Sequence, residues 1–326
     1  MLVDSFGRKH DYLRISLTDQ CNFRCLYCMP QEHMEFMPPN ELMQANEIFQ
    51  IAKIFVELGV NKIRLTGGEP LIRKDIIQIV SQLATLPVNL TLTTNGYLIE
   101  KHLPLLLKAG IQSINISLDT LQANKFKQIT QRDGFQKVWN AIQLLLQNNR
   151  HVKVNTVLMK DKNYDEILDF VNLSIHHPLH IRFIEFMPFT GNEWEHKQVV
   201  TQQEILDLVR TNYDLEKLTD EKHDTAKKYK IKGAQGTFAI ITTMSEPFCG
   251  DCNRLRLTAD GKIKNCLFAA EESHLLQNLR NGKDILTIIK QSIWQKKARQ
   301  GGQFPDNFKE AESDKIINRS MISIGG

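Results

Sequence analysis

The chain has 326 residues, of which 42% are hydrophobic and 24% are charged, and its formal net charge is +4. These fractions are typical of a soluble globular protein, and the charge is too small to indicate nucleic-acid or membrane binding by itself. The N-terminus has no apolar run resembling a signal peptide, and no later stretch approaches the roughly 18 apolar residues of a membrane helix. We therefore expect a cytoplasmic protein without a membrane or nucleic-acid partner.

Up to about residue 210, short β-rich runs alternate with helical patterns. The predicted strands are 12–18, 62–66, 89–94, 113–118, 152–158 and 180–185. The helical patterns lie at about 40–58, 73–85, 100–109, 135–149 and 163–175. Six β/α units in a row imply a parallel sheet, which is either doubly wound or curled into a barrel, and spacing alone does not decide between these.

The pattern changes past about residue 215. A charged stretch is followed by predicted hairpins around 233–236 and at Asp260-Gly261, and then by two helical segments ending near Lys297. The sequence therefore predicts an α/β region over 1–215 and a smaller C-terminal α+β region over 216–326. Residues 321–326 follow a polar stretch without a core pattern, which predicts a mobile tail.

Three cysteines lie close together after the first predicted strand, as Cys21-x-x-x-Cys25-x-x-Cys28. In a reducing compartment, six cysteines favour metal or redox chemistry over disulfides. Three thiolates on a [4Fe–4S] cluster leave one iron open, which the amino and carboxylate groups of S-adenosylmethionine suit. A structural zinc site is the alternative, but it usually takes four ligands from paired units, which this spacing fits poorly.

The remaining cysteines form a second set of three, Cys249-x-x-Cys252 and Cys266. A zinc site completed by His274 is an acceptable interpretation of this spacing. If the first set holds a cluster, a second cluster with an open iron for substrate becomes the favoured interpretation, and it uses every cysteine.

The loop Gly67-Gly68-Glu69-Pro70 follows the second strand directly. Its glycines would let the backbone approach a ligand, and Glu69 could meet a cationic amine. An ordinary strand-to-helix turn is the alternative.

Side-chain alternation places several cations on one face of the predicted strands. Lys62 shares a face with Arg64, and Arg254 shares one with Arg256, because successive strand residues point to opposite sides. The other cations expected in the same interior are Arg14, Lys153 and Arg182. Buried cations are costly without partners, so this pattern predicts a bound anion, and guanidinium groups suit a polyphosphate. The alternative is that these side chains reach water or pair with carboxylates such as Glu185.

Taken together, the cysteine motif and the Gly-Gly-Glu-Pro loop resemble the radical S-adenosylmethionine superfamily. Longer segments are similar to the GTP 3′,8-cyclase family, also called molybdenum cofactor biosynthesis protein A. These segments are Leu13-Arg14-Ile15-Ser16, the Cys-Asn-Phe-Arg-Cys-x-Tyr-Cys-Met-Pro run at 21–30, Ile63-Arg64-Leu65-Thr66, the Cys-Gly-Asp-Cys-Asn-Arg-Leu-Arg-Leu run at 249–257, and Gly325-Gly326. The resemblance runs nearly end to end.

The resemblance implies a partial (β/α)6 TIM-like barrel with a C-terminal region that carries a second [4Fe–4S] cluster. By this resemblance the two sets of cysteines are the cluster ligands. S-adenosylmethionine would be contacted by Tyr27, Gly68, Glu69, Ser117 and Met187. GTP would be bound by Arg14, Lys62, Arg64, Thr93, Lys153, Arg182, Arg254 and Arg256. The last two arginines would also take part in catalysis, and Gly325-Gly326 would reach the active site.

The implied reaction is that of a lyase in the first step of molybdenum cofactor biosynthesis. A 5′-deoxyadenosyl radical removes hydrogen from C3′ of the ribose, and the carbon radical attacks C8 of guanine. Reduction then gives (8S)-3′,8-cyclo-7,8-dihydroguanosine 5′-triphosphate. The implied partners are a flavodoxin-type electron donor, a second copy in a homodimer, and cyclic pyranopterin monophosphate synthase downstream.

Two rival functions stay open from the residues. One is a radical enzyme that modifies a peptide, although such relatives usually need more than three C-terminal cysteines. The other is a zinc- or iron-binding scaffold without catalysis, which would leave the Gly-Gly-Glu-Pro loop without a task.

Overall fold

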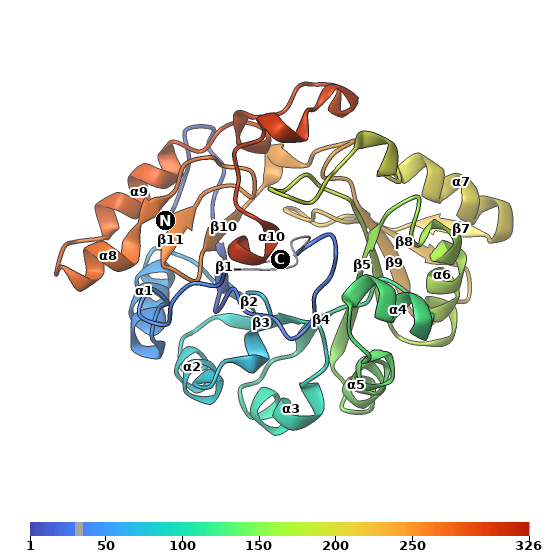
Figure 1. Ribbon diagram of the computed structural model, residues 1–326, viewed down its shortest axis with the longest axis horizontal. Helices are drawn as coiled ribbons and strands as arrows, with labels where there is room; N and C mark the ends of the chain where they lie inside the picture. Colours follow the sequence, from blue (N-terminus) through green and yellow to red (C-terminus); the bar gives the residue numbers. More distant parts are fainter. Residues whose placement is uncertain (30–34, 326) are drawn as a thin grey trace.

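The computed structural model describes residues 1–29 and 35–325. Six parallel strands lie side by side in chain order and curve into an open barrel (Figure 1). They are β1 (Tyr12–Ser16), β2 (Lys62–Thr66), β3 (Asn89–Thr94), β4 (Ser113–Ser117), β5 (His151–Leu158) and β6 (His180–Glu185). A doubly wound sheet would reverse its strand order partway, so the sequential order confirms the partial barrel.

Helices cover the convex face of this sheet (Figure 1). They are α1 (Ala45–Glu57), α2 (Ile76–Leu83), α3 (Ile99–Lys108), α4 (Ala123–Thr130), α5 (Phe135–Gln147), α6 (Ile167–His176) and α7 (Gln202–Asn212). Ile63 and Leu65 of β2 are fully buried against them, as the alternation predicts. Helices α4 and α7 were not predicted. The first is short, and the second is marked by a capping box of Thr201 and Glu204 that the sequence already contains.

Strands from the C-terminal third extend the barrel at both edges. Strand β9 (Thr237–Ile241) pairs in parallel with β6, and β10 (Arg254–Leu257) pairs in parallel with β1. Each continues into antiparallel neighbours, namely β8 (Lys227–Ile231), β7 (Leu215–Lys217), β11 (Lys262–Lys264) and β12 (Ser273–His274). Both predicted hairpins are confirmed. The boundary at residue 215 stays a prediction, because one sheet runs across it.

Helices α8 (Leu275–Arg280) and α9 (Leu286–Trp294) are the two predicted C-terminal helical segments. The short 3-10 helices are Pro70–Ile72, Tyr164–Glu166, His196–Gln198, Cys249–Asp251, Gln300–Gly302, Phe308–Glu310 and Ser313–Lys315. Within residues 1–29 and 35–325, no helix has the length and apolar character needed to cross a bilayer.

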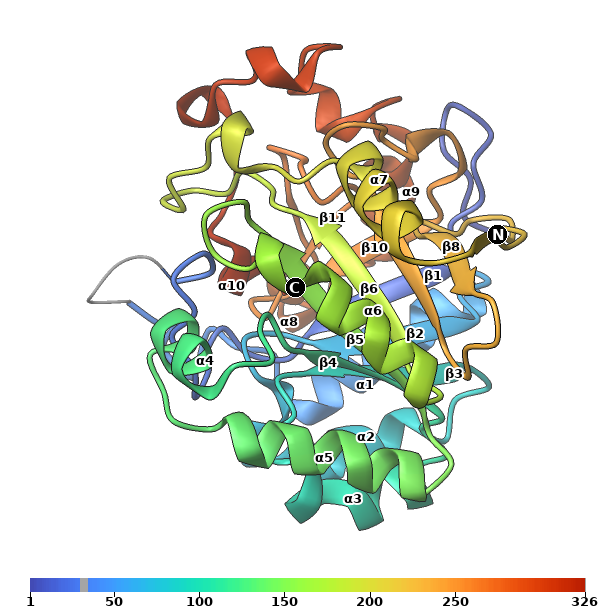
Figure 2. The ribbon, with the colours of Figure 1, turned by 90° about the vertical axis from the view of Figure 1, so that its right-hand side faces the viewer.

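The prediction of a mobile tail is wrong for residues 321–325. Helix α10 (Met321–Ile324) lies on the concave side of the sheet, where Ile322 and Ile324 are 2% and 1% exposed (Figures 1 and 2). The carbonyl oxygen of Gly325 then accepts a hydrogen bond from Arg256 Nη1 at 2.5 Å. Two buried isoleucines after a polar stretch are too short a pattern to predict a docked helix. Gly326 lies outside the described residues.

Arg319 anchors this tail to the β10–β11 turn. Its guanidinium donates to both carboxylate oxygens of Asp260, at 3.0 and 2.9 Å, and also contacts Glu272.

We expect Arg319→Gln to raise the rate at which carboxypeptidase removes the tail about tenfold, since losing charge-assisted bonds costs about 1.4 kcal/mol or more. Lys315→Gln, which removes an exposed pair with Glu312, is the control and should leave the rate unchanged. Equal rates for Arg319→Gln and the wild type would contradict the anchor.

Candidate functional site

A cavity of about 240 Å³ lies inside the barrel. The cations that line it come from five strands, and they are Arg14, Lys62, Arg64, Lys153, Arg182, Arg254 and Arg256. Register explains why they meet, since Arg14 lies opposite both Arg64 and Arg256 on the neighbouring strands. The structure therefore brings together every cation predicted from strand alternation.

Desolvation and crowding lower the pKa values of several of these cations, among them Lys62, Lys153, Arg182 and Arg256. Burial lowers the pKa of Lys153 to about 8 and that of Arg182 to about 10, and in both cases the charge of Arg64 adds to the shift. The pKa of Arg256 is likewise lowered to about 10 by burial. Lowered pKa values mean that the cavity disfavours its own positive charge, so a bound anion would stabilise it.

The suggested pairing with Glu185 does not occur. The Glu185 carboxylate instead accepts hydrogen bonds from the backbone of Met244 and Ser245 and from the Ser245 hydroxyl. Across the described parts of the chain, no ion pair with a carboxylate involves Lys62, Lys153, Arg182, Arg254 or Arg256. Most of the positive charge in the cavity is therefore not neutralised by a carboxylate of the described residues.

Several buried polar atoms along the same cavity also lack a hydrogen-bond partner in the described chain. They are Asn115 Oδ1, Asn155 Oδ1, Arg182 Nε and Arg254 Nη1. Leaving such atoms unsatisfied costs about 1–3 kcal/mol each, so their concentration in one cavity indicates a polar ligand. Asn115 was not predicted, although it lies opposite Lys153 in the β4–β5 register.

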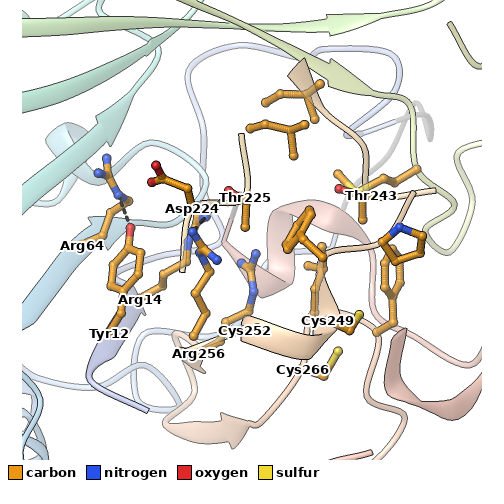
Figure 3. Close-up of a pocket in the computed structure, with 18 of the residues that line it drawn as sticks. Tyr12, Arg14, Arg64, Asp224, Thr225, Thr243, Cys249, Cys252, Arg256 and Cys266 are labelled. Carbon is orange, nitrogen blue, oxygen red and sulfur yellow. Dashed lines mark hydrogen bonds between the residues drawn. The ribbon is translucent and has the colours of Figure 1, made fainter. Parts of the chain in front are cut away.

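Tyr12 is a second residue that the sequence prediction missed, and it sits among the cations. Its hydroxyl accepts from Arg64 Nε at 2.5 Å, and its ring lies 4.8 Å from Lys62 Nζ and 5.5 Å from the guanidinium carbon of Arg254. Figure 3 shows the Arg64 contact as a dashed line. Tyr12 shares its face of β1 with Arg14, so strand alternation could have found it. Arg64 also donates to Thr93 Oγ1 at 3.3 Å, so Thr93 helps to hold that guanidinium.

The second set of cysteines lines the same cavity. Cys252 precedes β10 and Cys266 follows β11, and the antiparallel hairpin returns both to one end. Cys249 joins them from the 3-10 helix Cys249–Asp251, and Figure 3 shows its sulfur beside that of Cys266. This end is where the parallel strands begin, opposite to the strand ends at which the sequence places an active site.

The first set of cysteines lies at the other end, after β1. Burial raises the pKa of Cys21 to about 11 and that of Cys28 to about 12, and it raises the pKa of Cys25 well above its usual value. Uncharged thiols are therefore favoured until a positively charged metal centre is present. Cys21 Sγ accepts from Phe23 N at 3.4 Å and from Asn95 Nδ2 at 3.7 Å.

Both sets of cysteines suit an iron–sulfur cluster by the chemistry of their donors. All six cysteines are free and partly exposed, and each set is gathered on one loop or hairpin. No three His, Cys, Asp or Glu side chains among the described residues are close enough together to hold a single metal ion. His274, which the zinc alternative needs, is exposed on β12. The ligand roles of the six cysteines stay predictions.

The Gly-Gly-Glu-Pro loop packs on the first cysteine loop. Gly68 N donates to Thr18 O at 2.6 Å and Glu69 N to Gln20 O at 2.8 Å, and a Cβ on Gly68 would overlap the Gln20 carbonyl. We predicted that the glycines let the backbone approach a ligand closely. In the structure, Gly68 lies this close to the backbone that carries Cys21.

Glu69 is fully buried, and its carboxylate accepts from Leu71 N, Thr94 Oγ1 and Asn95 N at 2.7–3.0 Å. Burial raises its pKa to about 7. These bonds tie the loop after β2 to the end of β3, while a contact from Glu69 to a cofactor stays a prediction.

The other predicted cofactor contacts lie near the carboxyl ends of the strands. Ser117 ends β4, and Met187 follows β6 and lines the cavity. The Tyr27 hydroxyl donates to Asp119 Oδ2 at 2.8 Å, which fixes the ring beside the first cysteine loop. The structure therefore places these residues on the same side of the barrel as the first cysteine set.

Models of known protein families match both halves of the chain. Residues 15–174 match the Radical SAM superfamily, and residues 179–301 match Molybdenum Cofactor Synthesis C. Human molybdenum cofactor biosynthesis protein 1 is 50% identical over 330 residues, which cover 99% of this chain and 51% of the human protein. The chain thus spans about half the length of that relative.

A plant relative matches over most of its length. The mitochondrial GTP 3′,8-cyclase of Arabidopsis thaliana is 46% identical over 333 residues, which cover all of this chain and 84% of the plant protein. Among solved structures, Streptococcus suis SuiB bound to S-adenosylmethionine superposes with a TM-score of 0.65 at 16% identity, covering 94% of this chain and 72% of SuiB. At that identity, the likeness to SuiB shows the fold.

Gly68→Ala should destabilise the chain, because the added methyl group meets backbone that cannot move without disturbing the cysteine loop. We expect a loss of about 3 kcal/mol in the free energy of unfolding of the metal-free chain, measured by denaturant titration. Gly282→Ala is the control, since it has a φ of +67° and open space around it, and it should cost only about 1 kcal/mol. Equal losses would show that the contact with the cysteine loop is unimportant.

Tyr12 should titrate near neutral pH. Burial opposes ionisation, but the charges of Arg64 and Arg14 outweigh it and lower the pKa to about 7. Since the unfolded pKa is about 10, the unfolded chain binds more protons between these values, and this group makes stability rise with pH there. The measurement is the tyrosinate absorbance of wild type minus Tyr12→Phe, and inorganic triphosphate should move the transition to higher pH. A difference titration near pH 10 would contradict the strongly positive cavity.

Proposed function

Because this chain belongs to the GTP 3′,8-cyclase family of the radical S-adenosylmethionine superfamily, we propose that it converts GTP into 3′,8-cyclo-7,8-dihydro-GTP for molybdenum cofactor biosynthesis. The observation that carries the proposal is the cavity, where seven cations from five strands converge next to the second cysteine set. A triphosphate would supply an anion to Lys62, Lys153, Arg182, Arg254 and Arg256, which form no ion pair with a carboxylate of the described residues.

The chemistry of the reaction needs two groups bound at the cysteines. Cys21, Cys25 and Cys28 would hold a cluster that binds S-adenosylmethionine, and this cofactor would supply the radical chemistry at C3′ of the ribose. Tyr27, Gly68, Glu69, Ser117 and Met187 would position that cofactor at the carboxyl ends of the strands. Cys249, Cys252 and Cys266 would hold a second cluster with an iron open to the guanine.

The chain's own cavity residues bind and orient GTP. Lys153 and Arg182 lie on the neighbouring strands β5 and β6, so they can hold the triphosphate from one wall. Arg254 and Arg256 on β10, and Lys62 on β2, flank β1 on the other wall, and the two arginines lie next to the second cysteine set. A nucleotide held between these two walls would have its ribose and its base fixed relative to each other. Fixing C3′ close to C8 in this way would lower the barrier to their bond.

The proposed partners follow from the same chemistry. An electron donor of the flavodoxin type would reduce the clusters, and the product would pass to cyclic pyranopterin monophosphate synthase. A homodimer and a cytoplasmic location complete the proposal. The location follows from the cysteines, because a reducing compartment keeps their thiols available as cluster ligands.

An anaerobic assay with three nucleotide conditions tests this function. Protein reconstituted with iron and sulfide is supplied with reductant, S-adenosylmethionine and GTP, ATP or no nucleotide, and products are followed by mass spectrometry. We expect 5′-deoxyadenosine and an isomer of GTP to form only with GTP. Equal deoxyadenosine without nucleotide would keep the radical chemistry and remove the substrate assignment.

Two cysteine variants separate the roles of the two sets in the same assay. Cys25→Ser should abolish 5′-deoxyadenosine, because the first set no longer holds its cluster. Cys252→Ser should retain some 5′-deoxyadenosine but form no cyclised nucleotide. Normal product from Cys252→Ser would contradict the proposed role of the second set.

A further inference from the structure

Lys296 is a buried lysine beside the second cysteine set. It lies two residues past helix α9 and is 3% exposed. Its Nζ donates to Arg254 O at 3.1 Å and contacts Cys252 Sγ at 3.6 Å. The ammonium group is therefore held between the backbone of β10 and a predicted cluster ligand.

The Lys296 ammonium is not neutralised by a carboxylate of any described residue. In the described regions of the chain, none of the ion pairs includes Lys296. The nearby Asp4 is already paired with Arg8 at 2.6 Å and His10 at 3.0 Å. Burial and the charge of Lys296 lower the pKa of His10 to about 4, so that ring is neutral. A buried ammonium without a carboxylate is costly, and Cys252, as a thiolate, would supply an anion within its reach.

The frame around Lys296 is rigid. The Arg8 guanidinium donates to the carbonyl oxygens of Cys249, Lys297 and Ala298, each at 2.8 Å. One side chain thus ties the chain after α9 to the loop that carries Cys249. Because the backbone on both sides of the contact is fixed, the ammonium cannot easily move away from the sulfur.

The hydrogen-bond donors to the other sulfurs are neutral. Cys21 Sγ receives a backbone N–H and the Asn95 amide, and Cys249 Sγ receives the backbone N–H of Gln300 at 3.3 Å. Among the hydrogen bonds to sulfur in the described chain, that of Lys296 is the one with a charged donor. The two cysteine sets are therefore placed in different electrostatic surroundings.

We propose that Lys296 is a positioning residue that holds the Cys252 thiolate and raises the reduction potential of the second cluster. This rests on the proposed function, because it needs a cluster at Cys249, Cys252 and Cys266. Taking up one electron from a low-potential reductant makes a cluster more negative. A fixed positive charge next to a ligand sulfur stabilises that reduced form more than the oxidised form.

The test is a redox titration of the reconstituted full-length protein, followed by electron paramagnetic resonance. The second cluster's signal is identified as the one that is lost in Cys252→Ser, and the first cluster is the internal reference. We expect Lys296→Met to shift the second cluster to lower potential and leave the first unchanged. Lys296→Arg keeps the charge and should titrate close to wild type. Lys297→Met, the same change at the exposed neighbouring lysine, should titrate as wild type.

Iron content separates failure of this inference from failure of the proposed function. If the wild type contained the iron of only one cluster, instead of the about eight irons of two, both the second cluster and this role of Lys296 would be ruled out. With both clusters present, an unchanged potential in Lys296→Met would overturn the role of Lys296 alone. If Lys296→Met loses the second cluster, the arginine variant Lys296→Arg distinguishes a role of the charge from a role in packing. Retention of the cluster in the arginine variant supports the charge, and its loss shows that lysine is needed only for packing.

Discussion

Like charges packed into one barrel are the constraint on which the site depends. Each cation on the concave face costs desolvation and repels its neighbours, as the lowered pKa values of Lys153 and Arg182 show. Because stability is a small difference between large terms, the repulsion within this cluster is a substantial cost, which a bound anion would offset. Tyr12 relieves part of this repulsion, since its hydroxyl and ring contact Arg64, Lys62 and Arg254.

Topology is what brings these charges together. Strand alternation places the cations of β1 and β2 on one face, but the register of β10 against β1 places Arg254 opposite Tyr12, 242 positions earlier in the chain. The same pairing carries Cys252 to the start of the parallel strands, while Cys21 lies at their end. The second set of cysteines therefore bounds the cavity at the end where the parallel strands begin.

Elements with a strong local pattern could be predicted from the sequence, and those that depend on distant partners could not. The six barrel strands and both hairpins were predicted because alternation and glycine turns are local. The roles of Gly68 and Glu69 in packing depend on Gln20 and Asn95, which no local pattern identifies. Tyr12 was within reach of the alternation rule, whereas nothing in the sequence marks Lys296, whose significance comes only from its place beside Cys252. The docked tail was missed because its contacts are all tertiary.

The docked tail also connects the two ends of the cavity. Asn318 Nδ2 donates to Leu267 O, next to Cys266, at 3.1 Å, and Gly325 O accepts from Arg256. A side chain at position 325 would press on Ser16 and Thr66, at the carboxyl ends of β1 and β2, so glycine is required for the backbone to lie this close. One short segment therefore touches the loop of the second cysteine set, a cavity arginine and the strand ends that lead to the first set. A ligand that moved the Arg256 guanidinium would also change the position of the tail, because this guanidinium donates the hydrogen bond to Gly325 O.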